Sequence, residues 1–197
     1  LASNVGAYVT GSKNVTVTDA AAILHLQTIR SYTTGTITAA SITDTAANLA
    51  ADAATNSGAG TYLAGATTVT VSGSATVAQL GAIDAAFTGG TPTYGTVADT
   101  AANLATNTGG YVSGSHAVTV TDTATVSQLN TIDGLTTGVI TATTSGTNAS
   151  LATLTGVGNA YSLTVTDTIN VTQANVLDAK TTGVITGTVS DTAANAA

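Results

Sequence analysis

Two short motifs alternate along the whole chain, and this repetition constrains the fold more than any other feature of the sequence. The first motif, an apolar residue and Thr in strict alternation, ends in Asp in its clearest copies. Its copies begin at Val15, Val69, Val118 and Leu163. The second motif, Asp-Thr-Ala-Ala-Asn, begins at Asp44, Asp99 and Asp191. Self-similarity of this kind is typical of proteins in which each repeat packs mainly on its neighbours.

The two motifs are versions of one pattern, because each places Asp, or Gly instead of Asp, just after an apolar and Thr alternation. The aligned positions are Asp19, Asp44, Gly73, Asp99, Asp122, Gly146, Asp167 and Asp191. The mean step between them is about 25 residues. We therefore expect eight coils in a single repeat array over residues 1–197, grouped as four double-coil repeats at approximately 1–60, 61–110, 111–160 and 161–197.

Each coil reads as one strand followed by one short helix. In Val118-Thr-Val-Thr the period of two predicts a half-buried strand. The apolar residues Val126, Leu129 and Ile132 then recur at a spacing of three, which predicts one buried face of a short helix. The pattern predicts an α/β solenoid, with a parallel sheet, right-handed crossovers and helices on one side. An all-β parallel solenoid is the alternative.

Glycine and capping residues mark the two ends of each predicted helix. Thr-Thr-Gly follows three of the helices, and we expect its glycine to end the helix with a positive φ. These glycines are Gly35, Gly138 and Gly183. Gln79, Gln128 and Gln173 stand three residues after Thr or Asn, the spacing of a capping box. Two Gly- and Thr-rich stretches, 53–65 and 89–95, are expected to be loops.

Composition excludes several classes of function. The net charge is −7 with only three cationic side chains, so the chain is not expected to bind nucleic acid. No apolar run approaches the length of a membrane span, so no membrane insertion is expected. Cysteine is absent and all ten acidic residues are Asp, which removes thiol chemistry and Glu-based acid and base pairs. His25 falls at a capping-box position and His116 in a turn, so we expect no catalytic site and no enzyme activity.

The recurrent Asp residues support two interpretations. The favoured one is that each Asp caps the helix that follows it, at Asp44, Asp99, Asp122, Asp167 and Asp191. The weaker one adds Asp19 and treats all six as a ladder of calcium ligands, since stacked carboxylates repel unless a cation offsets them. Gly replaces Asp twice and no second acidic residue recurs nearby, so we expect no cofactor, with calcium as the alternative.

Two further sets of residues suggest a ligand-binding face as the alternative function. Thr-x-Thr pairs on stacked strands would form an array similar to the ice-binding face of solenoid antifreeze proteins. These pairs are Thr16 and Thr18, Thr119 and Thr121, and Thr164 and Thr166. One Tyr also precedes the first strand of each double coil, which would give a row suited to stacking on a glycan. These residues are Tyr8, Tyr62, Tyr111 and Tyr161.

The two ends of the sequence match each other. Asp191-Thr-Ala-Ala-Asn followed by Tyr8 and Val15-Thr-Val-Thr reproduces the internal segment from Asp99 to Asp122. The chain is therefore expected to continue head to tail, either into neighbouring repeats or into further copies of itself.

The strings Thr-Val-Thr-Asp-Thr, Ser-Asp-Thr-Ala-Ala-Asn and Thr-Thr-Gly-Val-Ile-Thr resemble the Ala/Thr-rich repeat regions of very large bacterial surface and secreted proteins. That group includes adhesin-like and surface-layer-like proteins that are exported by type I systems. The resemblance implies an extracellular or cell-surface location in a bacterium. It also implies a structural or adhesive role in a surface layer, a filament or a giant adhesin, and it supplies no catalytic residue.

Overall fold

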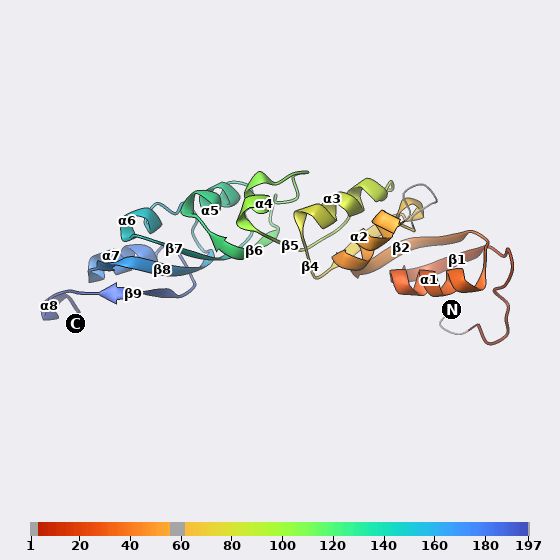
Figure 1. The fold of residues 1–197 in the computed structure, drawn as a ribbon, viewed down its shortest axis with the longest axis horizontal. Coiled ribbons are helices and arrows are strands. Elements are labelled where there is room, and N and C mark those ends of the chain that lie inside the picture. Colours follow the sequence, from red (N-terminus) through yellow and green to blue (C-terminus); the bar gives the residue numbers. More distant parts are fainter. Residues whose placement is uncertain (1–3, 56–61, 197) are drawn as a thin grey trace. The chain divides into compact units, whose positions relative to one another are not determined.

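The computed structural model describes residues 4–55 and 62–196 of the chain. They form an α/β structure of parallel strands and short helices (Figure 1). The chain divides into two compact units, Leu1–Gly95 and Thr96–Ala197, and each is described by itself. The α/β class with parallel sheets was predicted from the sequence and is confirmed, whereas the boundaries of the four double-coil repeats stay a prediction.

The first unit contains strands and helices that mostly alternate. Its elements are β1 (Val15–Ala21), α1 (Ile23–Tyr32), β2 (Ile37–Thr45), α2 (Ala46–Thr55), the 3-10 helix η1 (Leu63–Gly65), β3 (Thr68–Ser72), β4 (Ser74–Ala75) and α3 (Val77–Ala86). Strands β1, β2 and β3 form a parallel sheet in the order of the chain. Beyond β3, Thr70 forms an isolated parallel bridge with Thr93.

The second unit continues the same alternation. Its elements are β5 (Thr96–Asp99), α4 (Ala101–Thr106), β6 (Ala117–Ala124), α5 (Val126–Asp133), β7 (Ile140–Gly146), α6 (Asn148–Leu151), β8 (Ala160–Ile169), α7 (Val171–Asp178), β9 (Ile185–Val189) and α8 (Ala193–Ala196). Strands β5 to β9 are neighbours in chain order, and each adjacent pair is parallel. Figure 1 shows α4, α5 and α6 on one side of these strands.

The core of each unit lies between the strands and the helices. On β6 the apolar residues Val118 and Val120 are buried while Thr121 is exposed, as the alternation predicts. On α5 the side chains of Leu129 and Ile132 are fully buried. An apolar residue at every third helix position therefore faces the strands, and this packing stabilises helices that are too short to persist alone.

Capping boxes begin three of the helices, as the Gln spacing predicts. At α5 the side chain of Thr125 accepts a hydrogen bond from the backbone N–H of Gln128, whose side chain accepts from the N–H of Thr125. The same pairs form at α3 and α7. They are Thr76 with Gln79, and Asn170 with Gln173. The capping boxes are confirmed.

The Thr-Thr-Gly motif acts differently from the prediction. None of these three glycines, Gly35, Gly138 and Gly183, has a positive φ, so the expectation of a left-handed helix end is wrong. A Cβ at Gly138 would lie 2.2 Å from the carbonyl oxygen of His116. A Cβ at Gly35 would lie 2.3 Å from the carbonyl oxygen of Lys13, and one at Gly183 would lie 2.3 Å from that of Tyr161. The motif needs Gly because two backbone segments touch there.

The expected loops are only partly described. Residues 53–55 belong to α2, so the prediction of a loop there is wrong, and η1 occupies Leu63–Gly65. The part of that stretch at 56–61 lies outside the described residues. Residues 89–95 contain no helix and contribute only the bridge at Thr93.

Candidate functional surfaces

Four of the recurrent Asp residues cap a helix, but it is the helix before their own strand. The carboxylate of Asp122 on β6 accepts a hydrogen bond of 2.7 Å from the N–H of Ala101, the first residue of α4. Asp167 on β8 bonds the first residue of α6 in the same way, at 2.8 Å. The same bond joins Asp44 to Ile23 of α1 and Asp191 to Val171 of α7, at 2.9 and 3.0 Å. For Asp122 and Asp167 the predicted capping of the following helix is therefore corrected, because the strand returns beside the previous helix before its own helix begins.

The Asp residues of the Asp-Thr-Ala-Ala-Asn motif also bond within their own segment. In Asp44 one carboxylate oxygen accepts from the N–H of Thr45 and from the Asn48 side chain, at 2.7 and 2.8 Å. Asp99 bonds Thr100 and Asn103 in the same way. Asp191 likewise bonds Thr192 and Asn195. Here the carboxylate does contact the start of its own helix, while the hydroxyl of the next Thr caps it at α2 and α4.

These hydrogen bonds lower the pKa of two carboxyl groups. Partial burial of Asp44 acts to raise its pKa, but the hydrogen bonds from Asn48, Thr45 and Ile23 outweigh it, so the pKa of Asp44 lies below its usual value. For Asp191 the hydrogen bonds from Asn195, Val171 and Thr192 lower the pKa. Both carboxylates are therefore held in the charged form by donors of the protein itself.

The structure does not gather the Asp residues into a metal site. Within residues 4–55 and 62–196, no group of three or more His, Cys, Asp or Glu side chains could hold a metal ion. Asp19 is exposed, and no hydrogen bond joins its carboxylate to any of the described residues. It lines an open hollow of about 350 Å³ together with His25 and Leu24.

The Thr pairs are not stacked above one another. Thr119 lies opposite Thr141, which in turn lies opposite Ala160, four residues before Thr164. Thr164 lies opposite Ser145 instead. Thr119 and Thr164 therefore lie in different rows of the sheet, and the register between β6 and β7 shifts further between Thr119 and Thr123. Five of the six predicted residues are nevertheless exposed, namely Thr16, Thr18, Thr121, Thr164 and Thr166, whereas Thr119 is half-buried.

The four Tyr residues differ strongly in exposure. Tyr8 is 82% exposed, Tyr62 and Tyr111 are half-buried, and Tyr161 is fully buried. The hydroxyl of Tyr161 accepts a hydrogen bond of 2.9 Å from the side chain of Asn159. Tyr161 therefore offers no face on which a sugar could stack.

A buried polar cluster around Tyr161 was not anticipated from the sequence. Asn159 donates to Asp133 as well as to Tyr161, and its side-chain oxygen accepts from the N–H of Ile140. Burial of Tyr161 and the nearby charge of Asp133 raise its pKa well above the usual range, and the hydrogen bond from Asn159 only partly offsets this. Asp133 recurs as Asp84 and Asp178 at the same helix position, but Asn159 has no counterpart in the other repeats, so recurrence in the sequence did not mark the cluster.

The hydrogen bonds of the first Thr of Thr-Thr-Gly were also not anticipated from the sequence. The hydroxyl of Thr136 donates toward the carbonyl oxygens of Gly114 and His116, and accepts from the N–H of Gly138. Thr33 and Thr181 make the same set of bonds. All three are buried, whereas the second Thr of each motif is exposed. The recurrence of Thr-Thr-Gly in the sequence could have indicated that its first Thr has a structural role.

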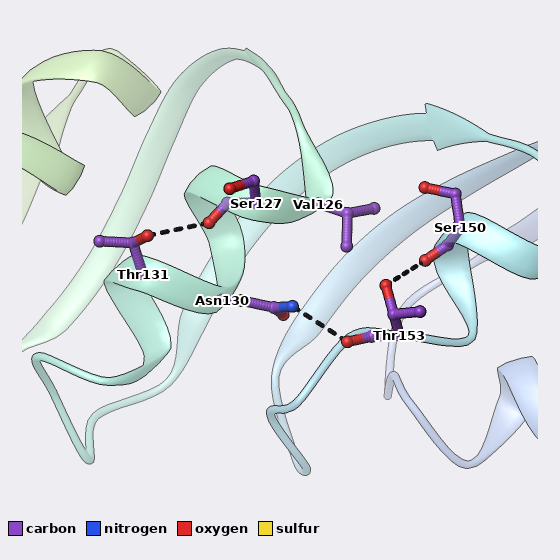
Figure 2. Close-up of a pocket in the computed structure, with 6 residues that line it drawn as sticks. All are labelled: Val126, Ser127, Asn130, Thr131, Ser150 and Thr153. Atoms are coloured by element: carbon purple, nitrogen blue, oxygen red, sulfur yellow. Dashed lines mark hydrogen bonds between the residues drawn. The ribbon is translucent and has the colours of Figure 1, made fainter.

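An open hollow lies between α5 and α6. Figure 2 shows its lining residues, Val126, Ser127, Asn130, Thr131, Ser150 and Thr153, around a space of about 530 Å³. Asn130 donates to the carbonyl oxygen of Thr153, at 2.9 Å. The hydroxyl of Thr131 donates to the carbonyl oxygen of Ser127, and that of Thr153 donates to the carbonyl oxygen of Ser150. The lining offers hydroxyl and amide groups but no titratable side chain, so it supplies neither a general base nor a charged ligand.

Comparison of the chain with protein-family models, curated proteins and solved structures finds no match. Among the described helices, none is both long enough and apolar enough to cross a membrane.

Proposed function

We propose that this chain is a non-enzymatic structural array, an α/β solenoid of stacked strand-and-helix coils within a bacterial cell-surface or secreted protein. In this proposal the coils themselves are the function, because they provide length and a regular surface to a surface layer, a filament or a giant adhesin. Coils continue head to tail, into neighbouring repeats or into further copies.

The observation that carries the proposal is the bond from four of the recurrent Asp residues to the helix before each of them. Asp122 and Asp167 stand 45 residues apart and bond the first residues of α4 and α6 in the same way. The bonds of Thr136 recur at Thr181, again 45 residues later. Contacts of this kind join one coil to the next, which is what a stacked array requires. The bacterial surface location is supported by the sequence resemblance alone.

Deletion of one double coil tests the solenoid. Removal of residues 118–162 joins Ala117 to Leu163, so that Asp167 takes the place of Asp122 beside Ala101. Because each coil should depend only on its neighbours, the shortened chain is expected to keep its circular dichroism spectrum and a cooperative unfolding transition. The matched control removes residues 118–152, which breaks the 45-residue period, and should lose both. Loss of folding in both variants would contradict a stacked array.

Antibodies raised against the chain test its location. They are expected to label intact cells of the source bacterium. Labelling that appears only after the cells are permeabilised would contradict a surface role.

A further inference from the structure

The segment from Asp99 to Asp122, called the joint below, connects α4 to β6 and shows how one double coil follows another. Asn107 ends α4, and its side chain bonds both the N–H and the carbonyl oxygen of Val112, at 2.8 and 2.9 Å. Strand β6 then pairs with β5 so that Asp99 lies opposite Val120. Asp122 completes the joint through its bond to Ala101.

The segment before β1 has the conformation of this joint. Asn4 bonds the N–H and the carbonyl oxygen of Val9, at 3.1 and 2.7 Å, as Asn107 bonds Val112. Thr33 then bonds Gly11 and Lys13 as Thr136 bonds Gly114 and His116. The first coil is thus shaped to follow a helix such as α4.

The exposed edge of β1 carries the groups that this joint uses. Within the described residues β1 pairs only with β2. Asp19 occupies the position of Asp122, yet its carboxylate has no hydrogen-bond partner there. The hollow beside it is bordered by Leu24, whose side chain is 66% exposed and replaces the Ser127 of α5. An apolar side chain and an acceptor are therefore both uncovered at this edge.

The edge of β9 carries the opposite half of the joint. Asp191 bonds Thr192 and Asn195 as Asp99 bonds Thr100 and Asn103. Two residues before Asp99, Val97 is fully buried, whereas Val189 at the same place before Asp191 is 52% exposed. Val189 also lines an open hollow of about 390 Å³ with Ile185 and Ala174. In the described part of the chain β9 pairs only with β8.

We propose that the β1 edge of one copy of this chain docks on the β9 edge of a second copy in the register of β5 and β6. Val189 then lies opposite Val15, and Asp191 lies opposite Val17. Asp19 lies beside Ala193, in the place that Asp122 has beside Ala101. This inference rests on the proposed function and adds the contact surface, the direction and the register of head-to-tail association.

Cysteine cross-linking tests the register, because the sequence contains no Cys. In the proposed pairing Ser190 lies opposite Thr16, as Ala98 lies opposite Thr119. Neighbouring strands are about 4.8 Å apart, which is within disulfide reach. Full-length T16C and S190C, mixed and oxidised at the highest soluble concentration, are expected to give the mixed dimer as the main product. S190C mixed with T38C is the control, because Thr38 is exposed on β2, a strand with neighbours on both sides.

Three results separate the outcomes. D19A in the T16C chain is expected to lower the rate of mixed dimer formation several-fold. Absence of the mixed dimer, or a yield no greater than that of either homodimer or of the T38C control, would overturn the docking. If the deletion of residues 118–162 still folds in that case, the stacked array stands and only the association between copies fails.

Discussion

The carboxylate of Asp122 accepts a hydrogen bond from the backbone N–H of Ala101, a residue that precedes it by 21 positions. This bond joins the start of one helix to the strand that follows it. Because the first N–H groups of a helix have no partner within the helix, an acceptor supplied by the next strand ties the two segments together.

Replacement of Asp122 by Ala should destabilise the second unit. Loss of a helix cap costs about 1 kcal/mol, with a usual range of about 0.5–2 kcal/mol. The matched control is D19A, which removes the corresponding carboxylate where it has no hydrogen-bond partner among the described residues and should change the free energy of unfolding by less than about 0.5 kcal/mol. Urea unfolding followed by circular dichroism measures both, and equal effects would contradict the assignment of the cap.

Gly138 and Gly134 should respond in opposite ways to substitution by Ala. A Cβ at Gly138 meets the carbonyl oxygen of His116 at 2.2 Å, so G138A should lower the free energy of unfolding by about 1–3 kcal/mol. At Gly134 the nearest atom is 3.4 Å away and φ is −69°, so G134A should be neutral or slightly stabilising. Thermal unfolding of the two variants checks this, and a stable G138A protein would show that the backbones separate easily.

Low pH should destabilise the chain over a pH range that the pKa values of Asp44 and Asp191 determine. The pKa of each is lowered in the folded state, so their stabilising contribution is complete above the unfolded value of about 4 and is lost as the pH falls through the folded values. The free energy of unfolding should therefore decrease below about pH 4. The double variant D44N/D191N should show a shallower decrease in urea titrations at successive pH values. An unchanged slope would contradict this assignment.

Alkali should destabilise the chain through Tyr161. Because the pKa of Tyr161 is raised by folding, its contribution is complete below the unfolded value of about 10 and is lost as the pH rises toward the folded value. Y161F should reduce this alkaline loss, whereas Y8F, which alters an exposed ring, should leave it unchanged. Urea unfolding from pH 8 to about 11 tests the difference, and the prediction fails if both variants behave as the parent protein does.

Local features of the fold were predictable from the sequence. The burial of Val118 and Val120 and the pairing of Thr125 with Gln128 involve residues two or three positions apart. Backbone geometry alone places such residues on one face or within one helical turn, whatever surrounds them. The parallel arrangement also followed, since most strands are separated from the next by a short helix.

Contacts between residues about 20 positions apart were decided only by the tertiary structure. The sequence predicted that Asp122 caps the helix that follows it, α5, whereas its carboxylate bonds the first residue of α4, which lies 21 positions earlier in the chain. Thr119 and Thr164 likewise occupy the same place in the repeated motif, yet the strand pairing places them in different rows. The repeat determined which residues recur, and the return of each strand beside the previous helix determined what they touch.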